Sequence, residues 1–73
     1  MTEPAEPRRL PPPWRVVERG ECFIVEDANG QQLAFVYFED EPGRRNLTKR
    51  LTSDEAWRVA SNIAKLPDLL LKR

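Results

Sequence analysis

Few side chains in this sequence could carry out catalysis by nucleophilic attack or metal binding. Cys22 is the single cysteine, and histidine is absent. A cysteine nucleophile needs a base that promotes its thiolate, and a zinc site or a histidine-based triad needs histidine or further cysteines. Cys22 stands among hydrophobic residues, with Glu21 and Glu26 nearby to disfavour a thiolate. The sequence therefore predicts a buried structural cysteine and no metal site.

Carboxylates are more numerous, but their positions are typical of solvated turns. They stand at the ends of the apolar runs: Glu26, Asp27, Glu39, Asp40 and Glu41. General acid–base catalysis needs two such groups held in a walled cleft, which one helix on a small sheet leaves no room to build. Residues 27–30 begin like a calcium loop but lack the downstream glutamate spacing of an EF-hand. We therefore expect no enzymatic activity and no cofactor.

Composition and hydropathy limit the remaining classes. The chain has 73 residues, 40% of them hydrophobic, and its twelve basic and twelve acidic side chains give a net charge of zero. A neutral chain is a poor wholesale binder of polyanions. No apolar run approaches the roughly 20 residues that span a bilayer, and residues 1–10 lack the apolar core of a signal peptide. We expect one small cytoplasmic domain without membrane contact.

The distribution of charge is more informative than its sum. Residues 18–41 carry seven acidic side chains and one basic one. The connection at residues 44–50 has no acidic side chain and four basic ones, which are Arg44, Arg45, Lys49 and Arg50. Such a cluster is either a solvated loop or a footprint for phosphate or an acidic protein. It supports the alternative function of a nucleic-acid-associated accessory protein that contacts phosphate through these four residues.

Proline dominates the start of the chain. Five of the seven prolines lie within residues 1–13, where their fixed φ and the restriction they impose on the preceding residue oppose a helix. This segment is predicted to be a flexible, proline-rich arm, and residues 14–73 form the folded domain. Arg8, Arg9 and Leu10 ahead of three prolines also resemble proline-rich ligands of aromatic grooves.

Three segments have the composition of β-strands. Residues 14–18, 21–27 and 32–39 are rich in β-branched and aromatic side chains. Arg19-Gly20 separates the first two, with room for a bulge, and Asn29-Gly30 separates the second from the third. Asn-Gly is typical of a two-residue type I′ turn, because both residues tolerate positive φ. The pattern predicts a three-stranded antiparallel meander.

A C-terminal helix gives the clearest signal. Thr52 to Glu55 reads as a capping box, and Pro67 ends the helix near residue 65 or 66, with a further turn over residues 68–71. One helical face is predicted to collect the apolar residues Ala56, Val59, Ala60, Ile63, Ala64 and Leu66, with Trp57 at its edge. Residues 44–50 show little beyond a short extended piece near 47–51. The fold class is α+β: a meander packed against one C-terminal helix.

The register of the second hairpin assigns side chains to the two faces of the sheet. With Asn29-Gly30 as the loop, Val25 lies opposite Ala34 and Phe23 opposite Val36. That face is wholly apolar and is the natural partner of the helix. We call it the dry face; it holds Phe23, Val25, Ala34, Val36 and Phe38, with Trp14 and Val16 added if the first turn is also tight. The other face presents four candidate protein-binding residues: Ile24, Leu33, Phe35 and Tyr37. The proline arm, residues 69–71, or another molecule would cover them.

The stretch from residue 14 to 70 also resembles known families. The DANGQ-LA-VYFEDEPGRR and DEA-R-A-NIAKLP segments resemble a family of short alphaproteobacterial proteins with no assigned activity. The strand order followed by a helix resembles the plant AP2-type domain and the arm-binding domain of tyrosine recombinases, which imply a sheet placed in the major groove of DNA. Here the strands carry Glu18, Glu21 and Glu26, which would face phosphates. The leading expectation is a non-enzymatic protein-interaction module that uses the apolar sheet face or the arm, and that could bind a second copy of itself.

Overall fold

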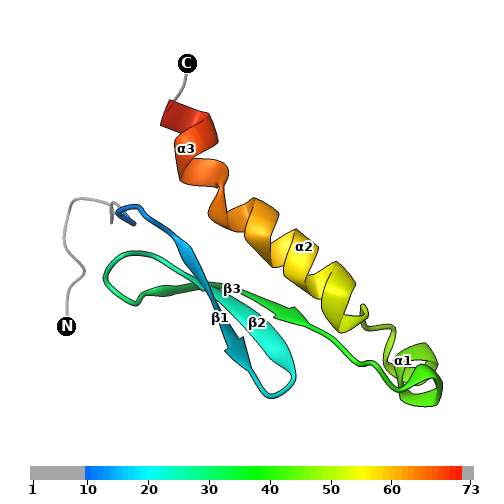
Figure 1. Cartoon of the computed structure of the whole chain (residues 1–73). Helices are drawn as coiled ribbons and strands as arrows, with labels where there is room; N and C mark the ends of the chain where they lie inside the picture. Colours follow the sequence, from blue (N-terminus) through cyan, green and yellow to red (C-terminus); the bar gives the residue numbers. More distant parts are fainter. Residues whose placement is uncertain (1–9, 72–73) are drawn as a thin grey trace, which may run out of the picture.

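The α+β class is confirmed in the computed structural model, which describes residues 10–71, with side chains as far as Leu69 (Figure 1). One antiparallel sheet has the strand order β1 (Arg15–Arg19), β2 (Cys22–Glu26) and β3 (Gln32–Tyr37). Three helices follow, α1 (Pro42–Thr48), α2 (Ser53–Ala64) and α3 (Leu66–Leu71). Most of the predicted arm, residues 1–9, lies outside the described residues.

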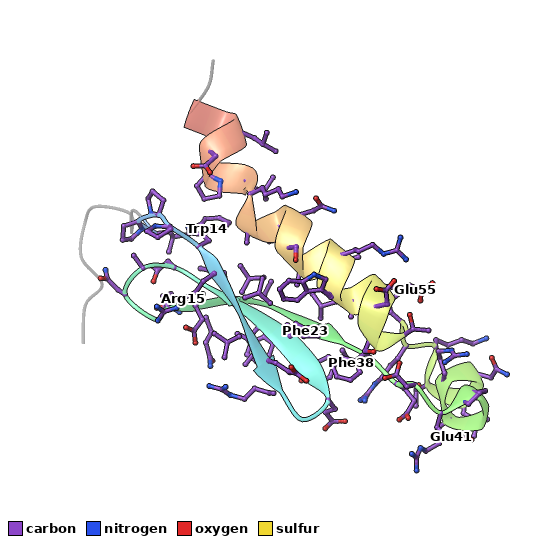
Figure 2. The ribbon with its side chains drawn as sticks, in the orientation of Figure 1. Trp14, Arg15, Phe23, Phe38, Glu41 and Glu55 are labelled. Carbon is purple, nitrogen blue, oxygen red and sulfur yellow. The ribbon has the colours of Figure 1, made fainter. Side chains whose placement is uncertain are left out.

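The core lies between α2 and one face of the sheet. Phe23 and Val25 from β2 meet Ala56 and Ala60 from α2, and these four residues are buried. The alanine methyl groups allow the helix backbone to approach the sheet closely. The partly buried residues around them are those predicted for the dry face and the helix: Trp14, Val16, Ala34, Val36, Phe38, Ile63 and Ala64. Figure 2 shows Phe23 and Phe38 on the side of the sheet that faces α2.

The predicted pairing of β2 with β3 is confirmed, with Phe23 opposite Val36 and Val25 opposite Ala34. The first hairpin turns one residue later in the chain than the predicted Arg19-Gly20 turn. Arg19 pairs with Cys22, so Gly20 and Glu21 form the loop, and the β1–β2 ladder runs in register without a bulge. Alternate side chains therefore stay on the predicted faces along all three strands.

The turn between β2 and β3 corrects the type I′ prediction. Gly30 has φ +86°, but Asn29 is not in the left-handed region. Backbone hydrogen bonds run from Gly30 N to Asp27 O and from Asp27 N to Gln31 O, which encloses a longer loop. A register shift between Val25 and Glu26 absorbs the extra residue as a bulge.

The side chain of Asp27 explains why this longer turn forms. Its Oδ1 accepts hydrogen bonds from the backbone N–H groups of Asn29 at 2.8 Å and Gln31 at 2.9 Å. The residue is only 2% exposed, so the carboxylate is part of the turn rather than a solvated charge. An aspartate that satisfies two loop amides favours this geometry over the two-residue turn.

The capping box of α2 is confirmed. The Thr52 hydroxyl accepts from Glu55 N at 3.1 Å, and the Glu55 carboxylate accepts from Thr52 N at 2.9 Å. The predicted apolar face of the helix was too wide, because Val59 is 43% exposed and Leu66 is also exposed. The helix meets the sheet along its alanine stripe, and Val59 lies about 100° around the helix from Ala60.

Helix α1 occupies most of the connection and takes in residues 47 and 48 of the extended piece expected near 47–51, whereas Leu51 forms a bridge with Phe38. Glu41 caps it by accepting a hydrogen bond from Arg44 N at 2.7 Å, and Pro42 occupies its first turn. Lys49 ends it in the left-handed region, with φ 60°. This helix buries none of its residues. None of the helices within residues 10–71 has the length and hydropathy of a membrane span.

Candidate functional site

The face of the sheet turned away from α2 carries most of the predicted protein-binding residues. We call it the open face and define it by Val17, Ile24, Leu33, Phe35 and Tyr37. Val17 pairs with Ile24 and Ile24 with Phe35, which places a row of apolar side chains across the three strands. Phe35 is 49% and Tyr37 45% exposed, whereas Leu33 is half-buried.

Ile24 does not supply accessible surface to the open face. It is only 4% exposed, because its central strand is flanked on both sides by the side chains of β1 and β3. Cys22, its neighbour on the same face, is a free and buried cysteine. These two residues form the floor of the open face, and the accessible apolar surface belongs mainly to Phe35 and Tyr37.

Neither described terminus covers the open face. Helix α3 contacts α2 and, among the described elements, no strand. Leu69 is exposed, and the side chains of residues 70 and 71 lie outside the described part. The last residues of the arm turn to the second hairpin, where Pro11 O accepts from Ala28 N at 2.9 Å. The Trp14 indole N–H donates to Leu10 O at 2.9 Å, on the core side. Residues 1–9 and 72–73 lie outside the described part of the chain.

Ion pairs stand at the two ends of the open face. Arg15 lies opposite Glu26, with Nε to Oε1 at 3.4 Å. At the other end, Arg50 lies with Nη1 2.8 Å from Glu21 Oε1 and with its guanidinium 4.9 Å from the centre of the Tyr37 ring. The hydrogen bond with Glu21 raises the pKa of Arg50 above its ordinary value. The face is thus apolar at its centre and charged at its ends.

The four basic residues of the connection do not form one free cationic surface. Arg44 pairs with Glu39 at 3.5 Å, and the Arg45 guanidinium donates to the backbone oxygens of residues 39 and 40. Arg50 is engaged with Glu21 and Tyr37 as described above. Among the described residues, Lys49 is the one of these four whose side chain has neither an ion pair nor a hydrogen bond. The structure therefore spreads the predicted phosphate site over separate intramolecular contacts.

The acidic residues at the start of α2 have structural contacts that explain their pKa values. Asp40 Oδ1 accepts a hydrogen bond from Ser53 N at 2.8 Å, and this bond lowers the pKa of Asp40. Hydrogen bonding with the backbone of Thr52 likewise lowers the pKa of Glu55. Both carboxylates lie beside the positive end of the helix dipole, which favours their ionised form. When both carboxylates are ionised, these hydrogen bonds fix the connection to the first turn of α2.

The outer edge of β3 is a feature that side-chain patterns did not indicate. Phe38 N donates inward to Glu21 O at 3.1 Å, and Glu39 N donates outward to Leu51 O at 2.8 Å. In an antiparallel ladder, alternate residues turn both backbone groups to the same side. Phe35 and Tyr37 therefore turn their N–H and C=O groups outward, and Leu33 before them is the extra residue of the bulge and has no partner on β2. Among the described residues, no backbone hydrogen bond from a turn, loop or helix end reaches Leu33, Phe35 or Tyr37.

The described residues include exposed aromatic side chains and unpaired backbone groups on β3. Among them, no three histidine, cysteine or acidic side chains are grouped so that they could hold a metal ion. Comparison of the chain with protein-family models, curated proteins and solved structures finds no match.

Proposed function

We propose that this chain is a non-enzymatic protein-interaction module of the cytoplasm and that the open face is its contact surface. The observation that carries the proposal is the half-exposure of Phe35 and Tyr37 side by side on β3. Aromatic side chains are enriched at the centres of protein interfaces, and charged side chains are depleted there. A partner that covers these two rings removes them from water without breaking any described contact of the core.

The arrangement around the two rings fits an interface as well. Ile24 and Cys22 form a packed floor beneath them, so the rings are presented on a firm sheet rather than on a loop. The ion pairs of Arg15 and Arg50 lie at the ends, where they supply a polar rim. This combination of an apolar centre and a charged rim favours a protein partner over a polyanion.

Binding of nucleic acid through the connection is the less favoured alternative. Arg44, Arg45 and Arg50 already interact with acidic side chains or backbone oxygens of the same chain. A phosphate would have to compete with these contacts, and the acidic Glu39 and Glu21 would remain close to it. The alternative predicts a salt-sensitive affinity that reversal of the four basic charges abolishes.

Affinity capture with matched variants tests the proposed function. The tagged chain is incubated with a lysate of its native host, half of it treated with nuclease, in parallel with the double variant Phe35→Ser/Tyr37→Ser. The control is Leu47→Ser, which removes a side chain that is 84% exposed on α1, away from the open face. All three proteins must first give the same circular dichroism spectrum.

The proposal predicts a protein that is retained by the wild type and by Leu47→Ser and lost by the double variant, with or without nuclease. Retention by the double variant contradicts the assignment of the open face. Captured material that disappears after nuclease treatment contradicts the protein-interaction function and supports nucleic-acid binding through the basic connection.

A further inference from the structure

We propose that the protein partner of this chain is a second copy of it, joined through the outer edge of β3 into one continuous six-stranded sheet in which the open-face side chains of the two copies lie next to each other. This inference rests on the proposed function and names its partner. It starts from the unpaired backbone groups of Phe35 and Tyr37, because such groups are completed by another strand. The open face alone does not require a strand, whereas the edge does.

The two edges of the sheet differ in charge. The outer edge of β1 carries Arg15, Glu18 and Arg19, and charged side chains on an edge strand oppose pairing with another chain. Residues 31–38, which contain β3, have no charged side chain. The edge of β3 therefore lacks the charged side chains that oppose strand pairing at the edge of β1. Of the two edges, it is the one that favours pairing with another strand.

The length of the unpaired edge determines one register. Beyond Tyr37 the edge is occupied by Leu51, which accepts from Glu39 N and forms a bridge with Phe38. At the other end Leu33 is the extra residue of the bulge, because Ala34 pairs with Val25 and Gln32 with Glu26. The free stretch is therefore centred on Phe35. A two-fold axis perpendicular to the sheet pairs residues of the same face, so Phe35 lies opposite Phe35 of the second copy.

Side chains match in this register. Leu33 of each copy lies opposite Tyr37 of the other, and the two Phe35 rings are neighbours at the axis. All three pairs are on the open face and are uncharged, as cross-strand aromatic and aliphatic pairs prefer. On the α2 face, Ala34 lies opposite Val36, both of moderate size. The outward backbone groups of Phe35 and Tyr37 in each copy gain hydrogen-bond partners at the same time.

The chain's own arm is a poor alternative occupant. A strand that pairs along Leu33 to Tyr37 must supply backbone N–H groups, and proline has none. Residues 1–13 contain five prolines, with no more than three consecutive residues between them. A second β3, by contrast, has the matching length and the matching alternation of outward groups.

Backbone N-methylation tests the edge without changing any side chain. The 73-residue chain is within reach of chemical synthesis by ligation. One product carries N-methyl-Phe35, which removes an outward donor of β3. The matched control carries N-methyl-Glu18, which removes an outward donor of β1 by the same alternation, because Val17 faces β2. Circular dichroism confirms the fold, and sedimentation equilibrium from micromolar to millimolar concentration gives the dimer dissociation constant.

The proposal predicts a dimer for the wild type and for N-methyl-Glu18, and a dissociation constant about 100-fold higher for N-methyl-Phe35, because one donor is lost from each copy. A wild type that stays monomeric overturns it, and so does an equal dimer of all three proteins. Hydrogen exchange at the Phe35 amide tests whether the chain's own arm occupies the edge of β3. A Phe35 amide that is protected from exchange in a monomer shows such an arm and also overturns the proposal of a second copy. A monomer that still captures a protein through Phe35 and Tyr37 leaves the proposed function intact.

Discussion

The buried carboxylate of Asp27 allows a quantitative prediction about the turn that sets the β2–β3 register. Truncation by Asp27→Ala removes the acceptor of two backbone N–H groups, those of Asn29 and Gln31. Each unsatisfied amide costs about 1–3 kcal/mol, and the exposure of both loop residues allows water to offset part of this cost. We expect a loss of about 2–3 kcal/mol in the free energy of unfolding. A domain of this size has roughly 4–11 kcal/mol in total.

The matched control is Asp27→Asn, whose amide oxygen can accept the same two hydrogen bonds without the charge. Hydrogen bonds to a charged acceptor are roughly twice as strong as neutral ones, so we expect the asparagine variant to lose only about 1 kcal/mol. Thermal unfolding followed by circular dichroism gives a midpoint about 8–24 °C below the wild type for alanine and about 4–8 °C below it for asparagine. Equal midpoints for the two variants, or an alanine variant as stable as the wild type, would refute the structural role of this carboxylate.

Three further predictions concern the helix and its connection. The pKa values of Asp40 and Glu55 are lowered in the folded state, so their contribution to stability is present above their unfolded pKa values and is lost as pH falls through the folded ones. Urea unfolding should therefore show a decline in acid that Asp40→Asn/Glu55→Gln flattens, and an equally steep decline in that variant would contradict it. Thr52→Ala removes the helix cap and should cost about 1 kcal/mol in the same assay, whereas no change would show that the cap is dispensable. Ile63→Ser should cost about 2 kcal/mol or more and the exposed Val59→Ser about 0.5 kcal/mol or less, and a reversed order would contradict the orientation of α2.

Strand pairing and the dry face were predictable because they depend on short-range patterns. Alternation of apolar residues and a glycine-containing turn were enough to place Phe23 opposite Val36, even though the turn type was wrong. The predicted turn type is wrong because it depends on Asn29-Gly30 alone, whereas the side chain of Asp27 stabilises a longer loop. The faces survived this error because the bulge compensates for the extra residue.

Helix α1 and the exposure of Val59 were not predictable from periodicity. A seven-residue helix that buries no side chain has no apolar repeat, so the remaining signal was Glu41 followed by proline at the first helical position. Val59 is apolar and lies near the predicted apolar face of the helix. The small side chains of Ala56 and Ala60 nevertheless determine which stripe of the helix meets the sheet. The outward backbone groups of β3 have no sequence signal of their own, because they depend on how the strands pair in three dimensions.

The nearest-neighbour order of the strands has a consequence for folding kinetics. Each strand pairs with the next along the chain through a short loop, and α2 then packs on the strands that precede it. Contacts between residues close in sequence form without the entropic cost of closing long loops, so we expect rapid folding for a chain that contains a sheet. Speed matters for this sequence, because the uncharged β3 is open to wrong partners until α2 has covered one of its faces.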